Sequence, residues 1–76
     1  MKNIKLNDIN SSIVNLDNFV TVRIHNATSY CSPNITIEQM LGSKMHIFIF
    51  EYKYEDDMLN DYVDILKCLD IKLENN

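Results

Sequence analysis

The residues best suited to chemistry are carboxylates in the last third of the chain. Asp57, Asp61 and Asp64 recur at intervals of three and four residues, so on a helix they share one stripe. Carboxylates at this spacing can hold a cation or act as an acid and a base. No histidine lies near them in the sequence and the EF-hand pattern is absent. Their simplest interpretation is therefore a charged, solvated helix face.

The remaining reactive residues form no recognisable catalytic or metal-binding motif. Two histidines, His25 and His46, and two cysteines, Cys31 and Cys68, are spaced unlike any zinc finger or ribbon. No nucleophile motif surrounds Cys31. The single glycine, Gly42, excludes the glycine-rich loops that cradle phosphates. We therefore expect no enzyme activity, no metal site and no cofactor.

The acidic residues are better candidates for binding a protein. The chain carries a net charge of −4, and residues 51–76 hold most of the acids. A rigid row of carboxylates resembles a run of phosphates in charge, and it disfavours direct binding to nucleic acid. The leading hypothesis is an inhibitor that blocks the basic groove of a host nucleic-acid-binding protein of the defence type. The expected contact residues are Glu51, Glu55, Asp56, Asp57, Asp61 and Asp64.

A second hypothesis uses aromatic side chains that alternate along one strand. Phe48, Phe50, Tyr52 and Tyr54 would share a face, and the two tyrosines lie near the strand end, where a partly wet interface suits them. This face would form a homodimer or a pocket between subunits, as in an antitoxin-like or ligand-sequestering protein. Small chains often gain stability by such association.

The composition indicates where such a protein originates and works. The chain has 76 residues, with a single glycine and a single proline. Asparagine and isoleucine, whose codons are AT-rich, are abundant, which favours an AT-rich genome such as that of a low-GC bacterium or its phages. No stretch approaches a membrane span and the first ten residues do not resemble a signal peptide. We expect one domain over residues 1–76, a cytoplasmic location and reduced thiols.

The pattern along the chain predicts an α+β fold. An antiparallel sheet of three to five strands would include short strands near 2–6 and 13–16, a half-buried strand over 19–25 and an edge strand over 71–74. Residues 45–54 are apolar on both faces at their centre, which predicts a central strand covered on both sides.

Two helices are expected beside this sheet. Thr36 and Gln39 fit a capping box and Gly42 fits a C-terminal cap, so a short helix is predicted over 36–41. Residues 55–69 form the strongest amphipathic pattern in the chain. Their expected inward arc includes Met58, Leu59, Tyr62, Val63, Ile65, Leu66 and Leu69. Asp56, Asp57, Asp61 and Asp64 fall on the opposite, water-facing arc.

Overall fold

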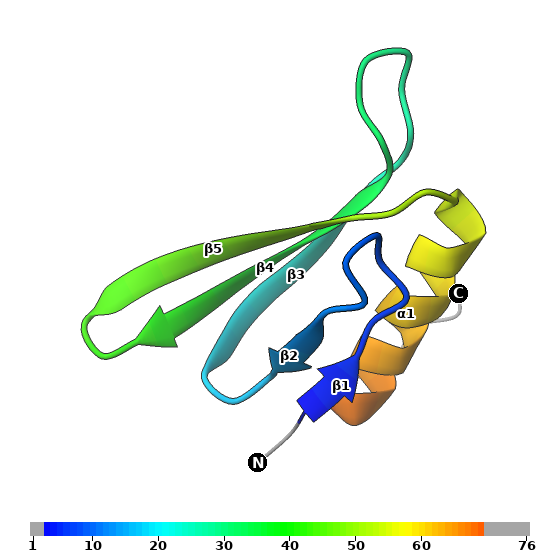
Figure 1. The fold of residues 1–76 in the computed structure, drawn as a ribbon. Helices are drawn as coiled ribbons and strands as arrows, with labels where there is room; N and C mark the ends of the chain where they lie inside the picture. Colours follow the sequence, from blue (N-terminus) through cyan, green and yellow to red (C-terminus); the bar gives the residue numbers. More distant parts are fainter. Residues whose placement is uncertain (1–2, 70–76) are drawn as a thin grey trace, which may run out of the picture.

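The fold is α+β, as predicted, with five antiparallel strands in two small sheets and one helix (Figure 1). A computed structural model describes residues 3–69. Its elements are β1 (Asn3–Lys5), β2 (Ile13–Asn15), β3 (Phe19–His25), β4 (Asn34–Leu41), β5 (Lys44–Glu51) and α1 (Glu55–Cys68). Strands β1 and β2 pair with each other, and the larger sheet has the order β3-β4-β5. The strand predicted over 71–74 lies outside the described residues.

The predicted short helix over 36–41 is wrong, because these residues belong to strand β4. Isoleucine and threonine at 35–37 are β-branched and favour an extended backbone. Gly42 has a φ of 67°, but it begins the two-residue turn Gly42-Ser43 that joins Leu41 to Lys44. A glycine in the first position of such a turn is typical of a tight β-hairpin. The residues that suggested helix caps therefore form a hairpin.

Strand β5 is not the central, doubly covered strand that its apolar sequence predicts. It pairs with β4 alone among residues 3–69, so it lies at an edge of the larger sheet. Helix α1 packs against β3 and β4, and Figure 1 shows the β4–β5 hairpin extending away from the helix. The apolar side chains on the outer face of β5 are consequently exposed.

The core lies between the inner face of the larger sheet, the β1–β2 pair and α1. Its buried side chains are Leu6, Val14, Leu16, Ile35, Ile37, Tyr52, Met58 and Ile65. Ile35 and Ile37 share the face of β4 that packs on the core, and Thr36 between them, on the other face of this central strand, is also buried. Helix α1 follows its predicted span closely, but Leu59 is 39% exposed rather than inward. The buried stripe of the helix is rotated toward Asp61 instead.

Candidate binding surfaces

Asp61 does not lie on the water-facing arc where the helical pattern places it. Its side chain is 1% exposed, in the middle of the stripe that α1 buries. The carboxylate accepts hydrogen bonds from the Tyr52 hydroxyl at 2.7 Å, the Asn7 backbone N–H at 2.5 Å and the Asn7 side-chain amide at 3.0 Å. A buried carboxylate needs such donors to offset the loss of water. Asp61 therefore joins α1 to the core and offers no charge to a partner.

Tyr52 is likewise a core residue rather than an interface residue. The side chain follows β5 and is fully buried, with its hydroxyl donating to Asp61. Burial, this hydrogen bond and the nearby carboxylates of Asp61, Asp8 and Asp57 raise the pKa of the Tyr52 phenol well above its ordinary value. The phenol consequently stays protonated and serves as a hydrogen-bond donor over the whole neutral range.

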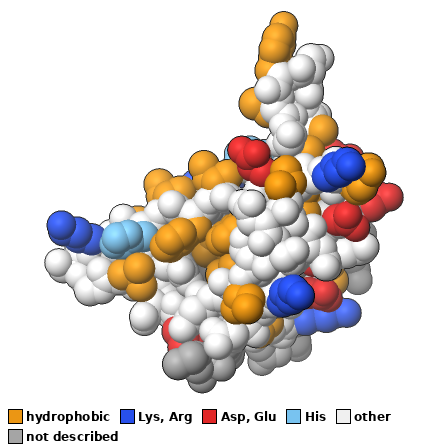
Figure 2. Space-filling model, in the orientation of Figure 1, with side chains coloured by type: hydrophobic (Ala, Val, Ile, Leu, Met, Phe, Trp, Pro, Cys, Tyr) orange, Lys and Arg blue, Asp and Glu red, His pale blue; other side chains and the backbone are white. Residues whose placement is uncertain are grey.

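Five of the six acidic candidates do remain at the surface. Asp57 is half-buried, and the exposed members are Glu51, Glu55, Asp56 and Asp64. Glu55 accepts a hydrogen bond from the Ala27 backbone N–H at 3.1 Å, which ties the long β3–β4 loop to the start of α1. Within residues 3–69 the only ion pair joins Arg23 to Glu38. Figure 2 shows red side chains mainly on the side of the molecule where α1 lies.

Tyr54 alone of the two tyrosines is available to a partner. It is 58% exposed and precedes α1, where it occupies the N-cap position without a capping hydrogen bond from its side chain. The ammonium of Lys53 lies 5.5 Å from the centroid of its ring, within the range of a cation–π contact. The aromatic face is thus divided, because Tyr54 faces solvent and Tyr52 faces the core.

The two histidines are not brought together, although His25 and Cys31 line the same open surface hollow. His25 lies opposite Asn34 at the open end of β3, whereas His46 lies opposite Gln39 on the other flank of β4. The His46 ring stacks on Phe48 with centroids 6.3 Å apart. Both cysteines are free thiols, with Cys31 exposed and Cys68 half-buried. No group of three or more metal-ligating side chains occurs in the part of the chain that the structure describes.

A row of exposed aliphatic side chains runs along the outer face of β5. Met45, Ile47 and Ile49 are 48%, 59% and 62% exposed, and Met40 lies directly opposite Met45 on β4. Figure 2 shows hydrophobic side chains gathered over this hairpin. We call Met45, Ile47 and Ile49 the β5 row. Single exposed aliphatics are ordinary, but a continuous row indicates an interaction surface.

The backbone of the β5 row also lacks a partner strand. In a hairpin with a two-residue loop, Leu41 and Lys44 form the first hydrogen-bonded pair. Alternation then turns the N–H and C=O groups of Met45, Ile47 and Ile49 away from β4. The same rule turns Glu51 outward, and its carbonyl indeed accepts a hydrogen bond from the Ile9 backbone N–H at 2.9 Å. The β1–β2 loop therefore covers the edge at Glu51 but leaves the β5 row open.

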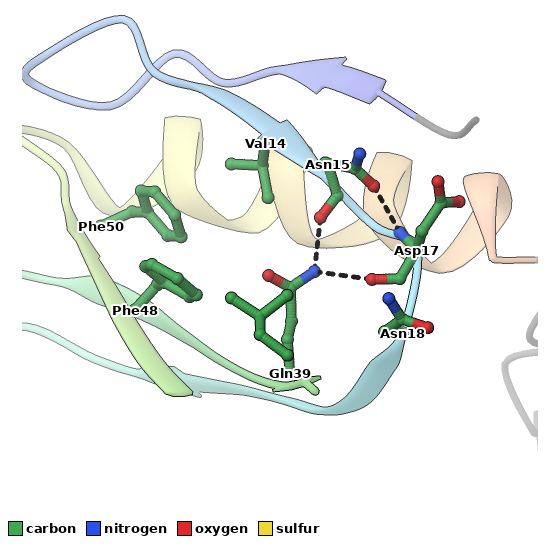
Figure 3. A pocket seen from close by; sticks show the side chains of 8 residues that line it. Val14, Asn15, Asp17, Asn18, Gln39, Phe48 and Phe50 are labelled. Atoms are coloured by element: carbon green, nitrogen blue, oxygen red, sulfur yellow. Dashed lines mark hydrogen bonds between the residues drawn. The ribbon is translucent and has the colours of Figure 1, made fainter. Parts of the chain in front are cut away.

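The inner face of the same hairpin borders a cavity of about 380 Å³. Figure 3 shows this cavity between the two phenylalanines of β5 and the turn that joins β2 to β3. Its lining residues are Val14, Asn15, Asp17, Asn18, Gln39, Leu41, Phe48 and Phe50. Gln39 is 6% exposed, and its amide nitrogen donates to the backbone carbonyls of Asn15 and Asp17. This cavity is more enclosed than the hollow beside the β3–β4 loop, and it combines aromatic and polar groups.

Comparison with protein-family models, with curated proteins and with solved structures finds no match to this chain. The one helix of the described residues is too short and too polar to cross a membrane. Sequence reasoning identified the exposed acids and the aromatic strand, but it missed the β5 row and Gln39. The Gly42-Ser43 dipeptide between two apolar runs was the available signal for the hairpin that creates both.

Proposed function

We propose that this domain is a protein-interaction module that associates with a second copy of itself through the open edge of β5. The observation that carries the proposal is the β5 row, in which the same residues expose both apolar side chains and unpaired backbone groups. Exposed edges are usually protected by a charge, a proline or a bulge. Residues 45–50 contain none of these, which favours an edge that is covered in the working protein.

Charge at the two ends of β5 favours a second copy in the antiparallel direction. The apolar residues are bounded by Lys44 at one end and Glu51 at the other. Antiparallel pairing places each lysine at the end of the strand pair where the glutamate of the other copy lies, on the opposite face of the sheet, whereas parallel pairing would place like charges side by side on one face. A two-fold axis through Ile47 would pair Met45 of one copy with Ile49 of the other. The three facing pairs would form about six backbone hydrogen bonds, and the two sheets would become one.

The test introduces one charge into the β5 row. Ile47 faces Glu38 on β4, so Ile47→Lys places a lysine beside an opposite charge within its own chain and keeps the fold. The matched control is Ile13→Glu, because Ile13 is 74% exposed on β2 and faces Lys5. Sedimentation velocity should find dimers for the wild type and for Ile13→Glu. Ile47→Lys should be monomeric, with an unchanged circular dichroism spectrum.

Two results would overturn this proposal. One is a wild-type protein that remains monomeric at every concentration reached. The other is an Ile47→Lys protein that dimerises as well as the wild type. A folded wild-type protein that stays monomeric would show that no second copy binds the β5 row. Dimerisation of the Ile47→Lys protein would show that the interface lies elsewhere on the molecule.

A second candidate function, inhibition of a basic nucleic-acid-binding protein, is favoured by one specific observation. Among residues 3–69, the exposed carboxylates of Glu51, Asp56 and Asp64 form no ion pair, so their charge is available to a partner. Because Asp61 is buried, a charge reversal at Asp61 would test the fold and not the binding surface. Asp61 must be left intact, and the charge reversal should combine Asp56→Lys with Asp64→Lys.

The experiment for this second function uses a purified host nuclease with a basic DNA groove. Titration calorimetry should find binding that weakens with added salt and is displaced by duplex DNA. The double charge reversal should abolish this binding, while Ile47→Lys should leave it unchanged. Binding that survives both the salt and the charge reversal would contradict the acidic hypothesis.

A further inference from the structure

We propose that the cavity beneath the β4–β5 hairpin binds a small, flat, neutral aromatic molecule that carries an N–H group. This inference is independent of the proposed dimer, because the open edge of β5 forms the dimer and the inner face lines the cavity. Three features of the cavity define the ligand, namely its size, its aromatic wall and the buried amide of Gln39.

The size and the wall select a small aromatic molecule. A volume of about 380 Å³ lies at the lower end of the usual range for ligand pockets, roughly 300–1,000 Å³. Phe48 and Phe50 form one wall and Val14 and Leu41 add aliphatic surface. Aromatic rings pack favourably against such side chains in offset or edge-to-face geometry. A mono- or bicyclic ring system is the chemical class that fills this space.

The amide of Gln39 selects a hydrogen-bond donor on that ring. Both backbone carbonyls within its reach, those of Asn15 and Asp17, accept hydrogen bonds from its nitrogen. Their chemistry fixes the orientation of the amide, because a carbonyl oxygen cannot donate to another carbonyl. The amide oxygen of Gln39 accepts no hydrogen bond within the described chain. Figure 3 shows it on the side of the amide where Phe48 and Phe50 lie.

An acceptor held in this way can bind a donor but cannot turn to bind an acceptor. The side chain is more than nine-tenths buried, but no fully buried side-chain oxygen of the described residues lacks a hydrogen-bond partner, so the Gln39 oxygen borders the open space of the cavity, where water or a ligand reaches it. A ligand N–H would satisfy the oxygen while the ring covers the phenylalanines. No cationic side chain lines the cavity, whereas Asp17 is among its lining residues. An anionic ligand would therefore lack a counter-charge and would lie near a carboxylate, which disfavours it against a neutral ligand.

Indole is the probe, because it is a neutral bicyclic ring with one N–H group. N-methylindole and benzofuran have nearly the same shape but cannot donate. Titrations followed by two-dimensional NMR of the isotope-labelled protein should show indole binding with a dissociation constant below the millimolar range. The largest shifts should occur at the Gln39 side-chain amide and at the backbone of Phe48 and Phe50. Both analogues should bind at least about five-fold more weakly, the usual effect of one lost hydrogen bond.

A variant at the mouth of the cavity provides a second test that leaves the core intact. Leu41 lines the cavity and is 43% exposed, so Leu41→Trp should fill the space and abolish indole binding. Leu59→Trp is the matched control, because Leu59 is 39% exposed on α1 and lines no part of the cavity. It should bind indole like the wild type.

Three outcomes would overturn the inference. A spectrum that indole leaves unchanged up to its solubility limit would exclude the aromatic site. Equal affinities for indole and N-methylindole would show that the Gln39 oxygen accepts no hydrogen bond from the ligand. Unchanged indole binding by Leu41→Trp would place the ligand elsewhere. Because the comparison of ligands uses the wild-type protein, a variant that fails to fold does not weaken the test.

Discussion

Replacing Asp61 by leucine should destabilise the domain far more than the same change at Asp64. Both residues lie on α1, three positions apart, and helical periodicity alone places them on one polar arc. The structure separates them, because Asp61 is 1% exposed and Asp64 is exposed. Leucine at position 61 leaves the fully buried Tyr52 hydroxyl without its acceptor.

The magnitude follows from the three hydrogen bonds that Asp61 accepts. An unsatisfied buried hydroxyl costs about 1–3 kcal/mol, and a bond to a charged group contributes about 1.5–3 kcal/mol. Asn7 is exposed, so water can replace part of what it loses. We expect Asp61→Leu to lower the unfolding free energy by about 2–4 kcal/mol, out of roughly 4–11 kcal/mol for a domain of this size. Asp64→Leu should change it by less than about 0.5 kcal/mol.

Urea denaturation followed by circular dichroism measures both variants. A double variant sharpens the test, because Tyr52→Phe removes the hydroxyl that Asp61→Leu leaves unsatisfied. Asp61→Leu combined with Tyr52→Phe should therefore be at least about 1 kcal/mol more stable than the sum of the single losses predicts. Equal effects at Asp61 and Asp64, or strict additivity of the two core changes, would refute the buried network.

Three further predictions concern the core and the thiols. Leu66→Ala removes a side chain that is 5% exposed and should lower the unfolding free energy by about 2–5 kcal/mol, whereas Leu59→Ala should lower it much less; equal melting temperatures would contradict the orientation of α1. Burial raises the pKa of the Tyr52 phenol in the folded state, so the contribution of this phenol to the unfolding free energy is complete below its unfolded pKa of about 10. Above that pH the contribution falls by about 1.4 kcal/mol per pH unit. Denaturation between pH 9 and 11 should show a steeper loss for the wild type and for Tyr30→Phe than for Tyr52→Phe; parallel curves would exclude this linkage. Alkylation of freshly purified protein should modify both Cys31 and Cys68, and mass spectrometry that finds a disulfide between them would contradict the reduced state expected in the cytoplasm.

Sequence periodicity predicts the elements whose conformation is set by local pattern. It fails for segments whose conformation is decided by contacts with distant residues. The strand over 19–25 and the helix over 55–68 follow directly from their periods. Residues 36–41 carry helix-capping residue types, yet pairing with two neighbouring strands keeps them extended. An i→i+3 pattern of Thr36 and Gln39 cannot reveal that Gln39 is bound instead to the β2–β3 turn.

The candidate site residues divide in the same way. Charge on Glu51, Glu55, Asp56 and Asp64 predicts exposure correctly, because an isolated carboxylate belongs in water. Asp61 is the exception, although its neighbours on the helix already indicated a buried position. It lies three residues after Met58 and four before Ile65, so two core residues flank it on the same face. Only the distant donors Asn7 and Tyr52 make that position tolerable for a carboxylate.

Amide hydrogen exchange at the β5 row reports directly on whether two copies of the chain pair along this edge. In a single chain, the N–H groups of Met45, Ile47 and Ile49 point away from β4, while those of His46 and Phe48 bond to it. Pairing of two copies predicts that the amides of the β5 row are protected in concentrated protein and lose this protection on dilution or in Ile47→Lys. The amides of His46 and Phe48 should remain protected throughout. Rapid exchange of the β5 row at every concentration, with the rest of the fold intact, would contradict the account.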